Sequence, residues 1–243
     1  MSLLEVRGIS KSFRGLKALH DVDITVDEGQ ILGIIGANGA GKTTLFNCVM
    51  GSFRPDSGTV TLAGRDVTGM PTHSLARAGM VRTFQLMRPF HSMTVHENVT
   101  IAALSGGART ERVARAEALA AIRSAGIEEW GDQNSGSLPA GVQKRLELAR
   151  VLTLRPRVLL LDEVLAGLVP AERNPVLDLL DTLRREQGMT MVFIEHIMAA
   201  VRRLSDSVVM MDQGTVLASG NVDDVLNDPA VIEAYLGKEY SNA

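Results

Sequence analysis

The chain has 243 residues, of which 45% are hydrophobic and 22% are charged, and its formal net charge is −3. A chain of this length buries roughly three quarters of the surface that it would expose when unfolded, so its core requires no disulfide or structural metal. The small negative charge does not support a nucleic-acid-binding protein, which usually carries a basic face, and we expect no nucleic-acid partner.

The first third of the sequence predicts three β-strands, at Leu3–Ile9, Ala18–Val26 and Ile31–Ile35. The second strand alternates acidic with apolar residues, as a half-exposed strand does. The third is apolar throughout, as a strand covered on both faces should be. A hairpin-like unit is expected near Thr59–Leu62.

A helix is predicted at Thr43–Met50, and it contains Cys48, the only cysteine of the sequence. A single cysteine cannot form an intramolecular disulfide, so we expect a reducing compartment. We interpret Cys48 as a small buried hydrophobic residue, with a reactive thiol as the alternative.

The middle of the chain predicts two alanine-rich helices, at Thr94–Leu104 and Arg109–Ala125. In the second helix we expect Val113, Leu119 and Ile122 to face the core and the arginines to face solvent.

Strands and helices alternate in the last third. Strands are predicted at Val158–Leu161 and Thr190–Ile194, with helices at Glu172–Glu186 and His196–Leu204. Such alternation with apolar strands predicts a mostly parallel sheet. The chain then predicts a hairpin and a final helix, at Ser207–Met211, Thr215–Ala218 and from Asp228 onward.

The apolar runs of the sequence fall far short of the roughly 20 residues that span a bilayer. The N-terminal segment Met1–Arg7 contains no apolar core of signal-peptide length. We therefore expect any association with a membrane to go through partner proteins.

The segment Gly36–Thr43 fits the phosphate-loop pattern GxxxxGK[ST] in full. Its backbone N–H groups must converge on phosphate oxygens, so glycines are needed where a Cβ would block the approach. A buried strand before the loop and a helix after it favour this interpretation over a mere tight turn. The predicted ATP-binding residues of the loop are Gly36, Ala37, Asn38, Gly39, Ala40, Gly41, Lys42, Thr43 and Thr44.

Two carboxylates, Asp162 and Glu163, end the strand Val158–Leu161. Adjacent carboxylates repel each other unless a cation is near or each has a separate task. With a phosphate loop in the same sheet, we expect Asp162 to hold the Mg²⁺ shell and Glu163 to polarise the attacking water. The alternative is a strand that simply enters a loop.

Two more polar residues are candidates for the same site. His196 follows the strand Thr190–Ile194, at the edge where open parallel sheets bind ligands, and is expected to contact the γ-phosphate. Gln85 begins the helical region and is expected to reach the magnesium. The predicted catalytic residues are Glu163, His196 and Gln85, and the predicted Mg²⁺ ligands are Thr43, Gln85 and Asp162.

In order and spacing, these motifs resemble those of ABC-transporter ATPase domains. The corresponding elements are the Walker A loop Gly36–Thr43, the Q-loop residue Gln85, a signature-like segment Leu138–Val142, the Walker B strand through Asp162, the catalytic Glu163 and the H-loop residue His196. Phe13 stands where the family has an aromatic ring that stacks on adenine, with a core phenylalanine as the alternative.

The resemblance spans essentially the whole chain. It implies an α/β P-loop NTPase fold of ABC type, with a mostly parallel core sheet, an antiparallel β subdomain and an inserted helical lobe. One ABC ATPase domain is then expected at 1–243, with the nucleotide-binding core and β subdomain at about 1–85 and 156–220, the helical lobe at about 86–155 and a C-terminal helical tail at about 221–243.

The finer similarity is to the ATPase subunits of branched-chain amino acid importers, and it rests on segments such as Lys11–Leu16, Arg82–Gln85, Ile194–His196 and Asp228–Gly237. It implies a subunit that hydrolyses ATP to power the import of branched-chain or related amino acids. The expected partners are two membrane permease subunits, a second ATPase subunit (a paralogue or a second copy) and, indirectly, a solute-binding protein. The expected location is the cytoplasmic face of the cell membrane, as a peripheral subunit.

The sequence departs from the family pattern in the segment that is expected to contact the nucleotide of a partner subunit. The resemblance implies that Leu138, Pro139, Ala140, Gly141 and Val142 face the nucleotide of the partner subunit, yet the usual motif is Leu-Ser-Gly-Gly-Gln. Proline supplies neither a hydroxyl nor an N–H. Losing one hydrogen bond to a charged group costs roughly 1.5–3 kcal/mol, so we expect a weaker phosphate contact there.

Two other functions stay open from the sequence. One is the ATPase of a lipopolysaccharide-type exporter, against which Arg82–Gln85 and Ile194–His196 favour the importer. The other is a nucleotide-gated regulatory subunit with low turnover, which the altered signature suggests. The presence of Lys42, Asp162 and Glu163 argues against it.

Overall fold

A six-stranded sheet forms the centre of the computed structural model, which describes residues 2–83, 89–108 and 110–236. Its strands run in the order β10-β9-β3-β8-β7-β6, and each neighbouring pair is parallel except β10 with β9. The strands are β3 (Ile31–Ile35), β6 (Met80–Arg82), β7 (Val158–Asp162), β8 (Thr190–Ile194), β9 (Ser207–Asp212) and β10 (Thr215–Gly220). The predicted mostly parallel core sheet is therefore confirmed.

A second, antiparallel sheet has the strand order β2-β1-β4-β5. It consists of β1 (Ser2–Phe13), β2 (Leu16–Asp27), β4 (Ser57–Leu62) and β5 (Arg65–Asp66). Val6 of β1, Ile34 of β3 and Phe46 of α1 (Lys42–Val49) belong to one buried cluster, so the two sheets and this helix share a core. In β2 the acidic residues are exposed and the intervening apolar ones buried, as the alternation predicts.

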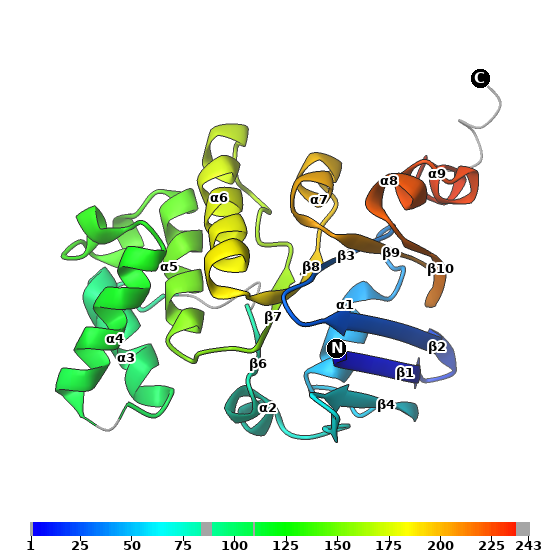
Figure 1. The fold of residues 1–243 in the computed structure, drawn as a ribbon, viewed down its shortest axis with the longest axis horizontal. Helices are drawn as coiled ribbons and strands as arrows, with labels where there is room; N and C mark the ends of the chain where they lie inside the picture. The colour runs from blue at the N-terminus through cyan, green and yellow to red at the C-terminus, as the bar shows by residue number, and fades with distance from the viewer. Residues whose placement is uncertain (1, 84–88, 109, 237–243) are drawn as a thin grey trace.

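The opposite face of the central sheet is covered by α6 (Pro170–Gln187) and α7 (Met198–Leu204), as Figure 1 shows. Successive residues of β7 point to different sides, so that Leu159 joins the buried cluster under these helices and Leu160 joins the cluster around α1. All five residues of β7 are buried. Cover on both faces explains why this strand is apolar until its last residue.

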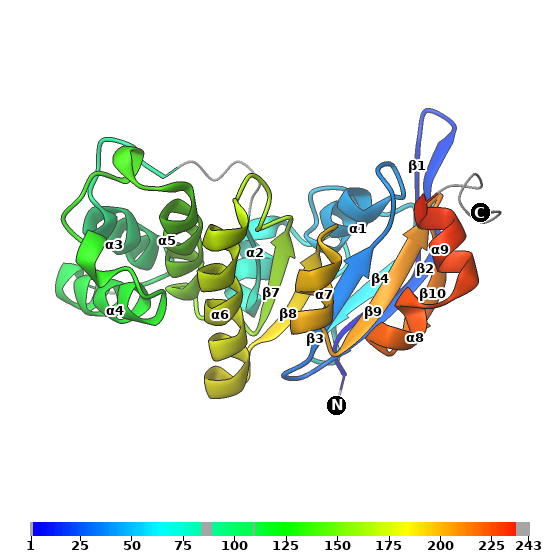
Figure 2. The same ribbon diagram turned by 90° about the horizontal axis from the view of Figure 1, so that it is seen from above.

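Three helices form a lobe beside α6 at one end of the molecule (Figures 1 and 2). They are α3 (Val95–Ser105), α4 (Glu111–Ser124) and α5 (Ala140–Leu152), and α2 (Thr72–Ala78) lies near β6. At the opposite end, α8 (Val222–Leu226) and α9 (Pro229–Leu236) contact β9 and β10. Single 3₁₀ turns occur at Glu128–Trp130 and Ser135–Ser137.

The inward face of α4 differs from the predicted one. Ile122 is buried as expected, but Val113 and Leu119 are 38% and 51% exposed, so the prediction was wrong for these two residues. Apart from Ile122, the buried face of α4 consists of alanines, among them Ala114 and Ala118. Small side chains let the helices approach closely, whereas the prediction rested on the large apolar residues of this segment.

The start of one helix also differs from the prediction, and two short elements were not predicted. The helix predicted to begin at His196 begins at Met198, because Ile197 is extended, with φ −90° and ψ 96°. The short elements α2 and β6 were not predicted from the sequence, since neither shows a clear periodic pattern over so few residues.

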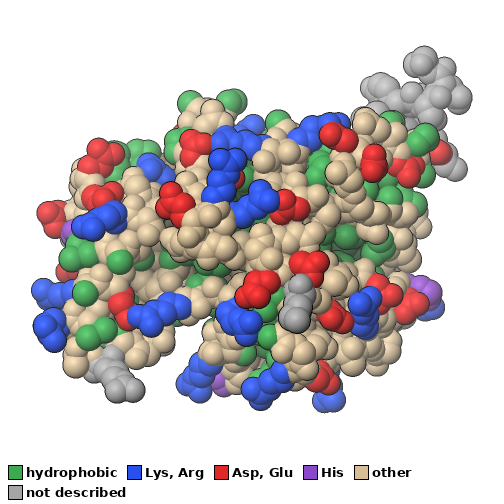
Figure 3. Space-filling view, viewed as in Figure 1, with side chains coloured by type: hydrophobic (Ala, Val, Ile, Leu, Met, Phe, Trp, Pro, Cys, Tyr) green, Lys and Arg blue, Asp and Glu red, His purple; other side chains and the backbone are tan. Residues whose placement is uncertain are grey.

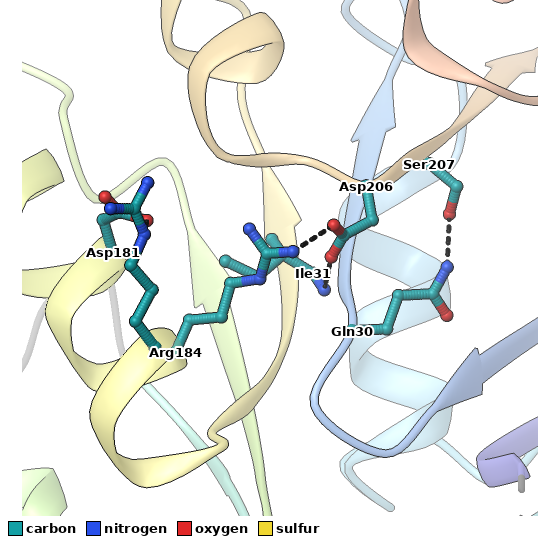
Figure 4. Close-up of polar contacts among 7 residues, drawn as sticks. Gln30, Ile31, Asp181, Arg184, Asp206 and Ser207 are labelled. Atoms are coloured by element: carbon teal, nitrogen blue, oxygen red, sulfur yellow. Dashed lines mark hydrogen bonds and ion pairs between the residues drawn. The ribbon is translucent and has the colours of Figure 1, made fainter.

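Side-chain contacts connect the amino-terminal ends of β3 and β9 in the central sheet (Figure 4). Asp206 accepts a hydrogen bond from the backbone N–H of Ile31 at 2.8 Å and forms an ion pair with Arg184 of α6. Beside it, the amide of Gln30 donates to the hydroxyl of Ser207 at 2.8 Å. These contacts join α6 to the start of β3 and β9.

Charged side chains of both signs are interspersed over the face that Figure 3 shows. Arg203 pairs with Asp178 between α7 and α6, and Arg202 pairs with Asp223 of α8. Among the helices of the described residues, none combines the length and hydropathy needed to cross a bilayer.

Candidate functional site

The glycine-rich loop follows β3 and leads directly into α1. A Cβ at Gly36 would lie 2.2 Å from the carbonyl oxygen of Met211, and one at Gly41 would lie 2.7 Å from that of Ala18. Both glycines also have positive φ values, of 147° and 102°. The N-cap residue of α1 is Gly41, which has no side chain to cap the helix, and the N–H groups of the first turn can therefore bind an anion.

A cavity of about 510 Å³ opens over this loop, within the usual size range of ligand pockets. The loop residues Asn38 to Thr44 line it together with Glu163, which comes from the end of β7. The remaining lining residues are Leu16, Lys17 and Ala18 of β2 and the turn residues Gln213 and Gly214.

The turn Gln213-Gly214 is a part of this cavity that the sequence did not predict. Its Gly214 N–H donates to Ala40 O at 3.0 Å, and Gly214 O accepts from His20 N at 2.8 Å. The sequence indicates only a hairpin turn here, because its proximity to the phosphate loop arises from the pairing of β9 with β3.

Lys42 is buried at the centre of the loop. Its ammonium group donates to Gly36 O at 2.6 Å and to Ala37 O at 2.9 Å. Burial lowers the pKa of Lys42, while the nearby carboxylates of Glu163 and Asp162 act in the opposite direction and favour its charged form. The result is a cation that the loop and two carboxylates orient together.

Asp162 is buried at the carboxyl end of β7 and forms an ion pair with Arg82 of β6. Arg82 also donates to Asn47 Oδ1 at 2.7 Å, and its guanidinium lies 5.4 Å from the centre of the Phe46 ring. The sequence did not predict this pair. β6 and β7 are neighbours in space only, and Arg82 lies opposite Leu160 in their register.

Glu163 is the first residue after β7 and has a left-handed backbone, with φ 48°. This conformation is unfavourable for a residue with a Cβ and is retained where the surroundings enforce it. Its N–H donates to Ile194 O of β8 at 3.0 Å. The turn directs the chain away from the sheet, and Glu163 lines the cavity.

His196 lies beyond the carboxyl end of β8, the strand between β3 and β7. Its ring is more than half exposed, and Nδ1 lies 3.9 Å from Oε2 of the buried Glu195. The three parallel strands β3, β8 and β7 thus bring Lys42, Asp162, Glu163 and His196 to one edge of the sheet, as the sequence predicts for a nucleotide site.

Asp162 and His196 lie at this sheet edge but do not line the cavity, and further predicted residues lie away from it or outside the described residues. Phe13 is 39% exposed, packs edge-on against Phe53 with ring centres 5.2 Å apart, and does not line the cavity. Gln85 lies outside the described residues, so its predicted role stays a prediction.

The signature-like segment begins α5 in the helical lobe. Pro139 stands at its N-cap and makes no side-chain cap bond, while Glu172 Oε1 of α6 accepts a hydrogen bond from the N–H of Gly141 at 3.4 Å. Pro139 and Ala140 are exposed, whereas Leu138, Gly141 and Val142 are buried. Because none of the five lines the cavity, a role towards the nucleotide of another subunit stays a prediction.

Comparisons with known proteins agree with this geometry. A family model described as ABC transporter matches residues 19–166, and one described as branched-chain amino acid ATP-binding cassette transporter matches residues 215–241. The high-affinity branched-chain amino acid transport ATP-binding protein BraF of Pseudomonas aeruginosa is 40% identical over 97% of this chain and 98% of its own. LivG of Escherichia coli is 39% identical over the same shares.

Solved structures show the same fold. A nucleotide-free ATP-binding cassette from an ABC transporter has a TM-score of 0.89 and 30% identity, covering 98% of this chain and 100% of the other. A structure of the ADP conformation of an ATP-binding cassette of an ABC transporter has a TM-score of 0.89 and 31% identity, covering 98% of this chain and 99% of the other.

Proposed function

This chain belongs to the ABC transporter family of ATP-binding cassettes, and we propose that it hydrolyses ATP to drive the import of branched-chain or related amino acids. The convergence of Lys42, Asp162, Glu163 and His196 at one sheet edge supports the ATPase activity. The match at residues 215–241 and the names of the relatives support the substrate class. They favour import over lipopolysaccharide export or a purely regulatory subunit.

In the proposed site, the loop N–H groups and Lys42 bind the phosphates. Thr43 in the first turn of α1 and Asp162 offer the hydroxyl and carboxylate oxygens that Mg²⁺ prefers, and this ion usually takes few protein ligands beside the phosphates. Bound there, Mg²⁺ would neutralise charge on the phosphate oxygens. Glu163 orients and deprotonates the attacking water, and His196 contacts the γ-phosphate. We keep Gln85 as a third magnesium ligand and Phe13 as the adenine contact in this proposal.

The test of hydrolysis is Glu163→Gln, which keeps the shape of the side chain and removes the base. ATP turnover by this chain in the assembled complex should fall by at least about 100-fold while ATP binding is retained, since general bases contribute about 10²–10⁴-fold. Glu186→Gln, at an exposed position of α6, is the matched control and should leave turnover unchanged. Equal turnover of wild type and Glu163→Gln would leave only a nucleotide-binding regulatory role.

We propose that the chain is a peripheral subunit at the cytoplasmic face of a membrane, in a complex with two permease subunits. An apolar cavity of about 260 Å³ between α2, α3 and α5 supports a docking site, and Val81, Ile101, Val151 and Leu154 are among the residues that line it. Phe90 at this cavity is 46% exposed, with the guanidinium of Arg150 5.5 Å from its ring centre. Asn98 holds Phe90 by accepting from its N–H at 2.8 Å.

The docking proposal predicts that Phe90→Ala weakens association with the permease and leaves ATP binding by the isolated chain intact. Removing a large side chain from an apolar contact should lower affinity at least about tenfold. Leu119→Ala, which truncates an equally exposed side chain elsewhere on the lobe, is the control. Co-purification from membranes that contain the permease measures both, and identical yields would exclude this cavity as the docking site.

We further propose that a second ATPase subunit completes each site, with Leu138–Val142 facing its nucleotide. The exposure of Pro139 and Ala140 at the start of α5 supports this role. We also propose that the chain divides into three parts. The nucleotide-binding core with the β subdomain is at about 1–85 and 156–220, the helical lobe at about 86–155 and the C-terminal tail at about 221–243. A solute-binding protein would act on the permease and reach this chain only indirectly.

A further inference from the structure

Glu195 is a buried acid whose role the proposed function does not include. It follows β8, is 1% exposed, and separates Ile194 from His196. A carboxylate is buried in proteins only where hydrogen bonds compensate for the lost water. Burial raises the pKa of Glu195, and hydrogen bonds from the backbone of Leu165, His196 and Ile197 act in the opposite direction.

The two oxygens of this carboxylate hold two different turns. Oε1 accepts a hydrogen bond from the N–H of Leu165 at 3.0 Å, in the turn after β7. Oε2 accepts from the N–H of His196 at 3.2 Å, in the turn after β8. One rigid group therefore connects the segments that carry Glu163 and His196.

The turn of Glu163 is fixed on both sides by the end of β8. The N–H of Glu163 is bound by Ile194 O at 3.0 Å, and the N–H of Leu165 is bound by the Glu195 carboxylate. Between them Glu163 keeps its positive φ of 48°, a conformation that persists only when its neighbours enforce it. Releasing the Leu165 end would allow this turn to relax and move the Glu163 side chain.

We propose that Glu195 is a positioning residue that fixes Glu163 and His196 relative to each other for ATP hydrolysis. The proposal rests on the roles assigned to those two residues under the proposed function. Glu195 does not line the nucleotide cavity, so it acts on the rate of hydrolysis through its neighbours and not on the binding of ATP. A misplacement of about 1 Å can reduce a rate by about 100-fold.

Glu195→Gln tests this directly. The backbone groups that face the side chain are all N–H donors, so an amide presents its NH₂ on one side and breaks the connection there. We expect kcat of ATP hydrolysis to fall at least about tenfold and KM for ATP to stay within about twofold. Glu195→Asp, which keeps two acceptor oxygens on a shorter side chain, should retain more activity than Glu195→Gln.

The control removes a different hydrogen bond, one that holds the segment between β7 and α6. Arg173 of α6 donates from Nε to Leu168 O at 2.9 Å, beyond the part that carries Glu163, so Arg173→Gln should leave kcat unchanged. In a Glu163→Gln background, Glu195→Gln should lower the residual rate by a smaller factor than it does in the wild type, because one of the two residues that it positions no longer acts as a base.

Three outcomes would overturn the proposal. The first is an unchanged kcat in Glu195→Gln, and the second is a loss of activity in this variant that comes from a raised KM for ATP. The third is a loss of kcat in Arg173→Gln as large as that in Glu195→Gln. If Glu195→Gln does not fold, the kcat of Glu195→Asp decides, and a wild-type value contradicts the proposal. Failure of the proposed function is recognised separately, since Glu163→Gln alone would then keep full turnover.

Discussion

The buried pair of Arg82 and Asp162 makes a strong prediction at the residue scale. Both side chains are almost fully buried, and removing one partner leaves an uncompensated charge in the core. Arg82→Met should therefore lower the free energy of unfolding by about 3–5 kcal/mol. Urea denaturation measures it, with Arg115→Met as the control, because the pair of Arg115 with Glu111 is exposed. Equal stability of the two variants would contradict a stabilising role for the buried pair.

Cys48 provides a second prediction at this scale. It is fully buried in α1, and burial raises the pKa of its thiol to about 11. The interpretation of Cys48 as a small buried hydrophobic residue is thus confirmed. At pH 8 the thiol is protonated and inaccessible, so a thiol reagent should label the native chain at least about 100-fold more slowly than the chain in denaturant. Fast labelling of the native chain would show that α1 opens locally.

The start of α5 carries the prediction at the element scale. Pro139 occupies the N-cap without a side-chain oxygen, and serine is among the preferred residues there. Pro139→Ser should stabilise the chain by about 0.5–2 kcal/mol in thermal or urea unfolding. It also restores the hydroxyl of the family motif, so the ATPase rate of the assembled complex should rise. A stability gain without a rate gain would mean that this branch uses backbone donors at the partner's phosphate.

Elements differ in how far the sequence predicts them. The strands around Ile34 and Leu160 are predictable because an apolar run bounded by turn residues has one plausible conformation. The inward face of α4 is not, because Ala114 is buried while Val113 beside it is exposed. Which of the two faces the core depends on how closely α3 and α5 approach, and only the packed structure determines that distance.

At the scale of the whole molecule, the nucleotide site also contains residues that the sequence predicts and residues that it does not. Lys42, Glu163 and His196 were predictable because each belongs to a local motif at the end of a strand, where a parallel sheet gathers them. Gln213 and the link through Glu195 were not, because each depends on contacts between segments far apart in sequence. The sequence therefore predicts the groups that would act on the nucleotide better than the groups that hold them in position.

Nucleotide binding should stabilise the whole chain, because the cavity is lined by β2 of the antiparallel sheet as well as by the phosphate loop and the β9–β10 turn. A ligand that binds only the folded state, at 100 times its Kd, raises the free energy of unfolding by about 2.7 kcal/mol. We expect this shift for Glu163→Gln with ATP and Mg²⁺, where turnover does not consume the ligand. Removing Mg²⁺ with a chelator should reduce it.

Lys42→Ala supplies the control for this measurement, because it removes the cation at the centre of the loop. The variant should unfold at the same denaturant concentration with and without nucleotide. If it showed the full shift, the ligand would bind elsewhere on the chain. If Glu163→Gln showed the shift in only one of two separate transitions, the two sheets would unfold independently, against the single buried cluster that joins Val6, Ile34 and Phe46.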